Sequence, residues 1–373
     1  MGLQMPHLFR GNMGKVIQMK TKPGKIDINE MKRGINKKVG MEVAFDLNHE
    51  NPALIKDWIP TGSSILDWVI YPGREAGIPV GRITELAGLS ASGKSFMAAQ
   101  IAANAQKKGM FVVYFDSEAA VDSAFLEKAG CDIGSMLYVQ TVSVEKTLET
   151  VEYCMDRYSD FQILFIWDSI AATPAEKDVE GDFNPQSSMA QKPRIFSKAF
   201  AKLQVPLERT QSTLLLVNQL KTNITSNVAE AMTTPYFAPG GKAIEFHCAL
   251  RIWLTRRKAK SGRVLDDNGA QIGSEVKAKI QKVRSPGYGR ECVFNIMWGG
   301  DKVRIADEES WLHALSNIKS DRYKIAGAWK TIIDKKGKEY KFQSKDWLVK
   351  LKDKEFKSVV LSILKEEYID KYK

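Results

Sequence analysis

The residues with the clearest chemistry are Gly88-Leu-Ser-Ala-Ser-Gly93-Lys94-Ser95, which match the pattern GxxxxGK[ST]. The two glycines let the backbone curl so that successive N–H groups point at phosphate oxygens. Lys94 supplies a charge for the β- and γ-phosphates, and the Ser95 hydroxyl suits Mg²⁺. The residues predicted to cradle a nucleotide are Gly88, Ser90, Ala91, Ser92, Gly93, Lys94 and Ser95.

A carboxylate ends an apolar run further along the chain, at Asp168 in the segment FIWDS. In P-loop enzymes an aspartate at such a strand end holds Mg²⁺, directly or through water. An aspartate after a strand can also serve only as a turn or helix-cap residue. The P-loop upstream favours the metal role, so Ser95 and Asp168 are the expected magnesium ligands.

Polar residues end two further apolar runs, Glu118 in the segment FDSE and Asn218-Gln219 in the segment VNQ. Because parallel strands deliver their carboxyl ends to one crevice, Glu118 is the candidate general base that polarises the attacking water. The alternative for Glu118 is a solvent-facing side chain. A neutral amide at 218–219 could sense the γ-phosphate, but a plain strand-end turn would also tolerate Asn-Gln. The residues alone leave both interpretations open.

The elements that must position these residues alternate between strands and helices from about residue 59 to 298. Strand-like runs occupy 82–87, 111–116, 137–140, 162–168, 213–219, 249–255, 275–283 and 292–298. Helical patterns occupy 94–108, 144–158 and 189–208. This alternation predicts an α/β fold with a mostly parallel central sheet covered by helices on both faces, and the later strands predict antiparallel additions to it.

The pattern divides the chain into three expected parts. Residues 1–58 form an N-terminal arm with a short amphipathic stretch near 29–39, which either docks on a neighbouring subunit or is a mobile basic tail. Residues 59–300 form the core. Residues 301–373 are expected to be a small, helix-rich, basic C-terminal domain, since residues 319–373 hold 16 Lys and Arg against 9 Asp and Glu, a net charge of +7.

Composition narrows the class of protein. The chain has 373 residues, 44% of them hydrophobic and 27% charged, so wholesale disorder is not expected. The net charge of +11 favours a polyanionic partner, although a basic but unspecialised surface would give the same number. The cysteines lack CxxC or other metal spacing; they are Cys131, Cys154, Cys248 and Cys292. We find no membrane-spanning run and no secretion signal, and expect a cytoplasmic protein of a bacterial cell or phage-infected host, with no membrane partner.

The motifs GLSASGKS, FDSE, FIWDS, VNQ and APGGKAIEF, in this order, resemble those of RecA-type DNA strand-exchange recombinases, bacteriophage versions among them. The resemblance covers about residues 59–298 and, more weakly, 327–329. It implies a RecA-like P-loop ATPase core with ATP and Mg²⁺ as ligands. It also implies DNA-stimulated ATP hydrolysis, polymerisation on single-stranded DNA as a helical filament, and pairing and strand exchange with homologous duplex DNA.

The resemblance also implies roles for individual residues. Glu118 matches the catalytic glutamate, and Gln219 matches the residue that links ATP to the DNA-binding loops. The adenine contacts match Asp122, Phe125 and Trp298, the subunit interface matches Phe246, and the cations that reach the ATP of the adjacent subunit match Lys282 and Arg284. Two such cations would neutralise charge that develops on the transferred phosphoryl group.

Two polar, aperiodic stretches match the DNA-binding loops of the family. The first is residues 180–189, ending at Met189; the second is residues 220–239, with Lys221, Asn223, Thr225, Ser226 and Asn227. The first loop differs considerably from that of bacterial RecA. The C-terminus lacks the acidic tail of bacterial RecA, and its basic charge suits a gateway for duplex DNA.

Other classes of protein share parts of this pattern. A hexameric RecA-fold helicase or motor has the same P-loop and acidic strand ends, but forms a closed ring of fixed size. A non-catalytic recombination mediator would keep only the nucleotide fold, and the complete set at Lys94, Ser95, Glu118 and Asp168 argues against it. Single-strand-binding and mediator proteins are further partners that a recombinase would meet.

Overall fold

A computed structural model describes residues 27–49, 51–180, 191–223, 235–256, 262–266, 268–284, 289–299 and 303–372. The chain divides into two compact units, residues up to Leu54 and residues from Ile55 onward. The first unit contains helix α1 (Ile28–Val39), which Asp27 caps by accepting hydrogen bonds from two backbone N–H groups. The exposed apolar side chains of α1 fall on one stripe at helical spacing, namely Ile28, Met31, Ile35 and Val39.

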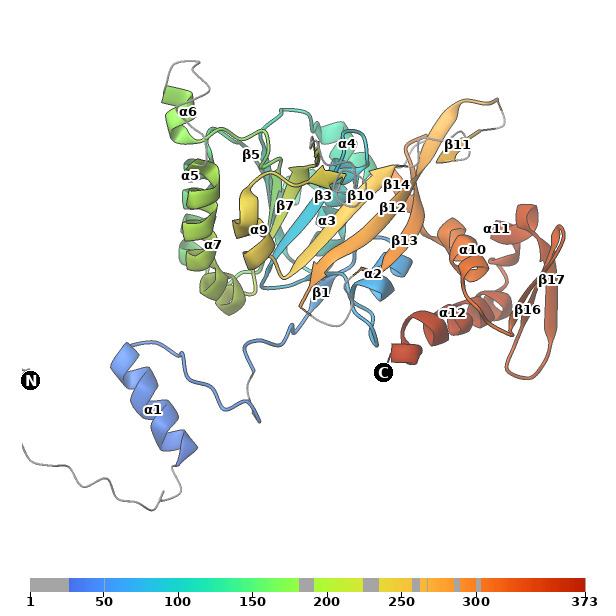
Figure 1. The fold of residues 1–373 in the computed structure, drawn as a ribbon, viewed down its shortest axis with the longest axis horizontal. Coiled ribbons are helices and arrows are strands. Elements are labelled where there is room, and N and C mark those ends of the chain that lie inside the picture. The colour runs from blue at the N-terminus through green and yellow to red at the C-terminus, as the bar shows by residue number, and fades with distance from the viewer. Residues whose placement is uncertain are drawn as a thin grey trace, which may run out of the picture. The chain divides into compact units, whose positions relative to one another are not determined.

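A ten-stranded sheet lies at the centre of the described part of the second unit (Figure 1). Its strand order is β14-β13-β12-β10-β3-β7-β6-β4-β5, with β11 paired to β12. Neighbours from β10 to β5 are parallel, whereas β11, β12, β13 and β14 are attached antiparallel. The predicted α/β class and the mostly parallel sheet are confirmed.

The strands lie close to the expected runs. Their bounds are β3 (Ile83–Gly88), β4 (Phe111–Asp116), β5 (Met136–Gln140), β6 (Ile163–Asp168), β7 (Thr213–Gln219), β10 (Leu250–Arg256), β11 (Arg263–Leu265), β12 (Gln271–Val283), β13 (Glu291–Met297) and β14 (Arg304–Ala306). Strands β11 and β14 were not predicted, because three residues are too few to show a periodic pattern.

Helices cover both faces of the parallel strands. They are α3 (Lys94–Lys107) on one face, and α5 (Val144–Arg157), α7 (Gln191–Thr210) and α9 (Gly241–His247) on the other. Alternation along β4 shows the division: Val112 and Tyr114 pack in the cluster that contains α3, whereas Val113 and Phe115 pack in the cluster that contains α5 and α7. Strands buried on both faces therefore leave only their ends for polar chemistry.

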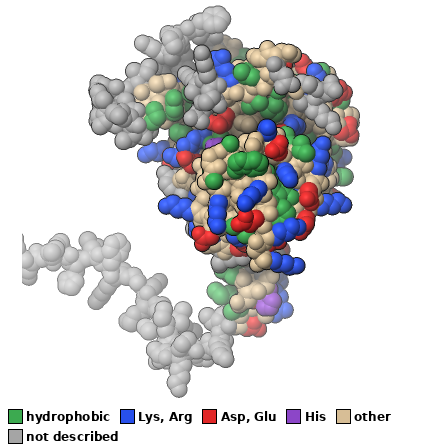
Figure 2. Space-filling view, turned by 90° about the vertical axis from the view of Figure 1, so that its right-hand side faces the viewer, with side chains coloured by type: hydrophobic (Ala, Val, Ile, Leu, Met, Phe, Trp, Pro, Cys, Tyr) green, Lys and Arg blue, Asp and Glu red, His purple; other side chains and the backbone are tan. Residues whose placement is uncertain are grey.

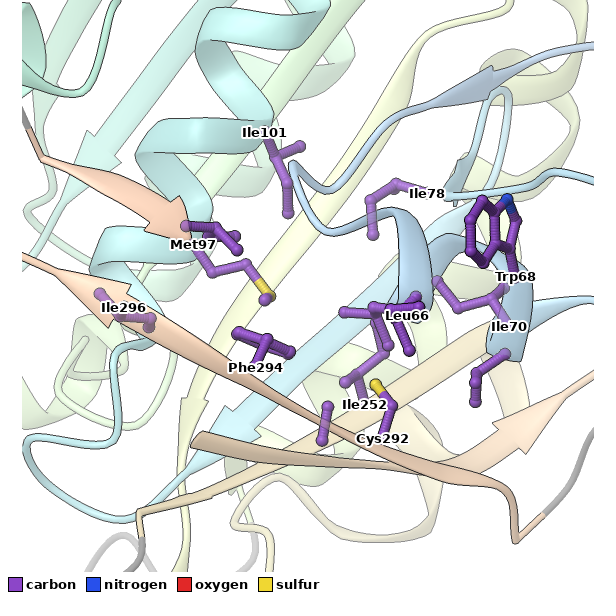
Figure 3. Packing of buried hydrophobic residues seen from close by; sticks show 14 of the residues in the cluster. Leu66, Trp68, Ile70, Ile78, Met97, Ile101, Ile252, Cys292, Phe294 and Ile296 are labelled. Atoms are coloured by element: carbon purple, nitrogen blue, oxygen red, sulfur yellow. The ribbon is translucent and has the colours of Figure 1, made fainter. Parts of the chain in front are cut away.

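The first cluster continues under the antiparallel strands. Figure 3 shows Leu66 and Ile70 of helix α2 (Ser64–Ile70) gathered with Met97 of α3 and with Phe294 and Ile296 of β13. The P-loop helix and the antiparallel strands thus share one core. Their relative position is fixed by packing.

The chain after residue 303 packs on the same hydrophobic cluster. Its helices are α10 (Asp307–Asn317), α11 (Trp347–Lys350) and α12 (Lys354–Tyr368). The indole N–H of Trp311 donates to Ser64 Oγ at 2.8 Å, and that of Trp347 donates to Glu308 O at 2.7 Å. Figure 2 looks onto this part of the molecule, where Lys and Arg side chains are interspersed with acidic and apolar ones.

A three-stranded antiparallel sheet in this segment was not predicted, since the sequence pattern indicated a helix-rich segment. Its strands are β15 (Tyr323–Ala326), β16 (Trp329–Ile333) and β17 (Glu339–Gln343). Each strand buries a single side chain, respectively Tyr323, Ile332 and Phe342. Such short, lysine-rich strands give almost no alternation for a sequence pattern to detect.

The other described elements are short. They are β1 (Trp58–Ile59), β2 (Ile78–Pro79), α4 (Ser123–Lys128), α6 (Glu176–Glu180), β8 (Lys221–Thr222), β9 (Tyr236–Phe237) and three 3-10 turns at Ile133–Ser135, Ser344–Asp346 and Asp370–Tyr372. None of the helices in the described ranges combines the length and the apolar character that a membrane crossing requires.

Candidate active site

The carboxyl ends of four parallel strands meet at one edge of the sheet. In the strand register, Asp116 of β4 lies beside Asp168 of β6, and Gly88 of β3 lies beside Gln219 of β7. Strand β6 joins the two pairs because Asp168 is paired with Val217 of β7. The residues that the sequence picked out from separate motifs are therefore brought together, as expected for ligand sites in parallel sheets.

Two positions of the P-loop tolerate only glycine. A Cβ on Gly88 would stand 2.3 Å from Ser92 Oγ and 2.7 Å from Leu254 O. Gly93 has a φ of +91°, and its Cβ would stand 2.4 Å from Ile296 Cδ1. Between the glycines, Ser90 and Ala91 are exposed, whereas Ser92 is buried and its N–H donates to Leu89 O at 3.2 Å. The tight turn leads straight into the N-terminus of α3.

The Lys94 ammonium lies across this loop. Its Nζ donates to Leu89 O at 3.0 Å. Burial lowers the pKa of Lys94, and the negative charges of Asp168 and Glu118 oppose that shift. The ammonium is thus partly desolvated and close to both carboxylates, where its interactions with anions are stronger than in water.

The carboxylate of Asp168 has two hydroxyl partners. Tyr114 donates to its Oδ2 at 3.0 Å inside the core. Burial raises the pKa of Asp168, while hydrogen bonds from Ser95 and Tyr114 act in the opposite direction. Ser95 and Asp168 therefore place two oxygens side by side at the edge of the P-loop. Oxygen donors are what Mg²⁺ prefers, so these residues fit that ion.

Glu118 lies on the turn after β4, and its side chain is aimed back at the strand ends. Its Oε1 accepts a hydrogen bond from Ser169 Oγ at 2.9 Å. Its backbone N–H donates to Asp116 Oδ1 at 2.9 Å, while Asp116 Oδ2 accepts from two later N–H groups of the same turn and from Tyr138. The buried Asp116 thus fixes the backbone that carries Glu118.

The residues expected at the adenine come from two separate segments. Asp122 is exposed and caps α4, because its Oδ1 accepts from Phe125 N at 2.6 Å. Phe125 is half-buried, with its ring edge-on to Phe96 at a centroid distance of 5.9 Å. Trp298 follows β13 and keeps 40% of its surface exposed. Both aromatic residues are partly exposed and offer a flat apolar ring. Asp122 also caps helix α4, a structural role that the motif did not indicate.

Lys282 lies away from the P-loop of its own chain. It is paired with Arg251, and Arg251 is paired with Glu85, three residues before Gly88. At a strand rise of about 3.3 Å, Lys282 is displaced from the P-loop by roughly 10 Å along the strand direction. Across the sheet, strand β10 also lies between Lys282 and β3. Its Nζ instead donates to the backbone carbonyls of Glu245 and Phe246, which lie in the last turn of helix α9.

Arg284, His247 and Phe246 lie around the half-buried Lys282. Burial lowers the pKa of Lys282, and the nearby charge of Arg284 lowers it further. The pKa of His247 is lowered in the same way, by burial and by the charges of Arg284 and Lys282. Phe246 is 72% exposed and meets His247 edge-on at a centroid distance of 5.0 Å. An exposed aromatic side chain beside cations is typical of an interface.

The expected DNA-binding residues are only partly described. Met189, Thr225, Ser226 and Asn227 lie outside the described residues, as does most of the first loop. The ends of the second loop are described, and form a narrow neck in which β8 pairs antiparallel with β9. Lys221 is exposed on this neck, and the N–H of Asn223 donates to Pro235 O at 2.9 Å.

Sequence reasoning missed two groups of polar contacts at this edge of the sheet. Tyr114 stands within an apolar strand, where its hydroxyl gave no indication of the bond to Asp168. Glu85, Asn218 and Arg251 form a buried network, with Asn218 Nδ2 donating to Glu85 Oε1 at 2.8 Å and Arg251 Nε donating to Glu85 Oε2 at 2.6 Å. A charged residue inside an apolar strand run was the available signal, since a buried charge needs a partner.

Comparison with known proteins agrees with this geometry. Residues 27–302 match the family model of the RecA N-terminal domain. The chain is similar to Protein RecA of Ruminococcus albus, 32% identical over 291 residues that cover 78% of this chain and 68% of that protein. It is also similar to Protein RecA of Mesoplasma florum, 31% identical over 321 residues that cover 86% of this chain and 90% of that protein. The chain belongs to the RecA family, whose members are DNA-dependent ATPases that act in homologous recombination and repair by strand exchange.

Proposed function

We propose that this chain binds ATP with Mg²⁺ at the carboxyl ends of β3, β4, β6 and β7, and that each site is completed by a neighbouring copy in a filament on single-stranded DNA. The observation that carries the proposal is the convergence of Lys94, Asp168 and Glu118 at the carboxyl ends of the parallel strands, with Lys282 and Arg284 away from them beside the exposed Phe246. In this proposal residues 59–300 are the ATPase core, and the chain works in the cytoplasm of a bacterial or phage-infected cell.

Within one protomer, each residue has a defined task. The N–H groups of the P-loop bind phosphate oxygens, and Lys94 exchanges its bond to Leu89 O for a γ-phosphate oxygen. Mg²⁺ at Ser95 and Asp168 would neutralise charge on the β- and γ-phosphates. Glu118 accepts a proton from the water that attacks the γ-phosphorus, while Gln219 faces the same edge and responds to the γ-phosphate. Phe125 and Trp298 stack on adenine, with Asp122 beside them.

The cations of the next protomer complete the site. Lys282 and Arg284 lie too far from their own P-loop to serve it, but they lie beside the exposed Phe246, whose carbonyl accepts a hydrogen bond from Lys282 Nζ. Packing of Phe246 against a neighbour would place both cations at that neighbour's triphosphate, where they stabilise the charge of the transition state. ATP then strengthens the filament contact, and hydrolysis weakens it.

The apolar stripe of α1 suggests a second contact between protomers. Ile28, Met31, Ile35 and Val39 leave an amphipathic helix with no buried residue of its own. Isolated helices of this length are marginal in water, so such a face calls for a partner surface. A neighbouring copy of the same chain is the partner that a filament provides.

DNA contacts are assigned to the two loops and to the C-terminal sheet. Loops 180–189 and 220–239 would hold single-stranded DNA, with Lys221 and Asn223 at the base of the second. In the C-terminal sheet, Lys324 and Lys341 flank Thr331 on one face, and the neighbouring row on that face carries the half-exposed Trp329. Paired lysines beside an aromatic ring suit a phosphate backbone, and we assign this face to homologous duplex DNA. Single-strand-binding and mediator proteins are further partners in this proposal.

Electron microscopy of the chain with single-stranded DNA and a non-hydrolysable ATP analogue tests the proposal. We expect regular helical filaments, together with ATP hydrolysis that is slow until single-stranded DNA is added and DNA affinity that falls steeply with salt. Closed particles of fixed size would favour a ring-shaped motor. An absence of turnover with both DNA and Mg²⁺ present would favour a non-catalytic mediator.

A further inference from the structure

Asn218 is a fully buried amide at the end of β7, next to Gln219. Its Nδ2 donates to Glu85 Oε1 and to Pro239 O, both at 2.8 Å, and its Oδ1 accepts from Gln219 N at 2.9 Å. Both N–H donors and the carbonyl oxygen of the amide are therefore engaged. A plain turn residue does not need these bonds, and a residue that senses phosphate would keep a donor aimed into the site.

One partner belongs to the strand that leads into the P-loop. Glu85 lies three residues before Gly88 and has no exposed surface. Its two carboxylate oxygens are divided between Asn218 and Arg251, which lies beside Glu85 in the register of β3 and β10. A buried carboxylate with a partner on each oxygen is held rigidly, because losing either bond leaves a desolvated charge.

The other partner lies at the exit of the second DNA loop. Lys221 and Thr222 pair with Phe237 and Tyr236 to form the neck of that loop. Pro239 follows the neck and precedes Gly240, the N-cap of α9. The side chain of Asn218 thus ties the strand that enters the neck to the segment that leaves it, and connects both to the P-loop strand through Glu85.

We propose that Asn218 is a positioning residue that holds this neck in register with the P-loop strand. Through this connection, nucleotide binding at the P-loop affects the structure at the base of the DNA loop. The inference rests on the proposed function, in which residues 220–239 bind DNA. Asn218 acts through Gln219 and Pro239, because all of its own polar atoms are engaged by protein.

One double substitution, E85Q/N218D, removes the bond to the neck while keeping a hydrogen-bond partner for Arg251 and for Gln219 N. The glutamine introduced at position 85 can accept from Arg251 and donate to the carboxylate introduced at position 218. That carboxylate can still accept from Gln219 N. Pro239 O loses its donor and faces a carboxylate oxygen instead, because a carboxylate has no N–H.

Two further variants are compared with the double substitution. Asn218→Ala removes all three side-chain hydrogen bonds, those with Glu85, Pro239 O and Gln219 N, and is the coarser variant. Asn104→Ala is the matched control, since Asn104 also donates to a proline carbonyl, that of Pro60 at 3.0 Å, away from the site.

The first measurement is the ratio of ATP turnover with and without single-stranded DNA. For E85Q/N218D we expect DNA-free affinity for an ATP analogue close to that of the parent. We expect a lower thermal stability, because the buried carboxylate faces a carbonyl oxygen and Arg251 loses its charged partner. We expect the DNA stimulation to fall by about 5- to 150-fold, the range typical of coupling between sites. Asn104→Ala should leave the ratio unchanged. A folded E85Q/N218D with parental stimulation would overturn the inference, as would an equal loss of turnover without DNA.

The second measurement does not depend on turnover. Hydrogen exchange at the N–H of Asn223 reports the neck, because this group donates to Pro235 O. We expect the ATP analogue to slow this exchange in the parent and in Asn104→Ala, but not in E85Q/N218D. The same response in all three proteins would overturn the inference. A parent whose turnover ignores DNA but whose neck responds to the analogue would instead count against the proposed function alone.

Discussion

The two halves of the central sheet bury their strands differently. In the parallel half, every residue of β3 and β6 is buried, since helices cover both faces. In the antiparallel half, β13 alternates between buried and partly exposed residues, as does the adjoining parallel strand β10, because only one face packs on the core. Strand β12 shares this alternation over its middle, where Lys277 and Lys279 are exposed.

This difference determines where chemistry can be placed. A strand buried on both faces can offer polar groups to a ligand only where it ends, and the parallel half gathers Asp168 and Gln219 there beside the P-loop. A strand with an open face can present charge along its length, and the antiparallel half carries Lys282. The parallel half is thus built to hold a triphosphate, and the antiparallel half is built to reach another molecule.

The largest expected effect is in the parallel half. Lys94→Ala removes the ammonium beside Asp168 and Glu118, and we expect ATP hydrolysis to fall by about a thousandfold or more, with loss of nucleotide binding. Turnover with single-stranded DNA and binding of a fluorescent ATP analogue measure both effects. Lys107→Ala, at the other end of α3, is the matched control and should behave like the parent. Normal hydrolysis by Lys94→Ala would show that the P-loop is not the nucleotide site.

In the antiparallel half, Lys282→Ala should separate binding from turnover. We expect ATP binding by the free protomer to remain nearly intact, cooperative assembly to weaken, and hydrolysis to fall by about a hundredfold. Lys277→Ala is the control on the same strand, where its exposed pair with Glu291 contributes little. If Lys282→Ala hydrolyses ATP normally at every protein concentration, Lys282 of one protomer does not act at the ATP site of its neighbour.

Phe246→Ala tests whether the surface beside Lys282 is an interface. The side chain is mostly exposed, so its removal should leave the melting temperature of the free protomer unchanged. A central interface aromatic contributes about 2 kcal/mol, so assembly should require roughly 30-fold more protein. Light scattering during titration measures this shift, with Val205→Ala, another exposed apolar residue, as the control. Unchanged assembly would exclude Phe246 from the contact.

The smallest expected effect concerns Tyr114. Tyr114→Phe keeps the ring but removes the hydroxyl that donates to Asp168, and we expect Mg²⁺ affinity to fall by about tenfold. Manganese binding, followed by electron paramagnetic resonance, measures this without turnover. Because that hydrogen bond lowers the pKa of Asp168 against the effect of burial, its loss should raise the pKa further. Asp168 is then protonated at higher pH, so the pH below which metal binding is lost should be higher in Tyr114→Phe than in the parent. The same pH dependence in both proteins would contradict this role.

The sequence was most informative where local rules decide the structure. The P-loop glycines, the helix expected at 94–108 and the long apolar runs of the parallel strands depend on short-range sterics and burial, and they were predicted. The C-terminal sheet depends on pairing between short lysine-rich strands, which no local pattern reveals. The partners of Asn218 and Tyr114 depend on strand order, because Glu85 and Asp168 are distant in the chain and adjacent only across the sheet.

A mixing experiment tests the cooperation of the two halves most directly. Glu118→Gln removes the proton acceptor but keeps Lys282, whereas Lys282→Ala lacks the cation but keeps Glu118. Each protein alone should be nearly inactive with single-stranded DNA and ATP. In an equal mixture, about a quarter of the contacts in a head-to-tail filament would combine an intact Glu118 with an intact neighbouring Lys282. Recovery of about that fraction of parental turnover is the predicted result, and a mixture as inactive as its components would contradict the account.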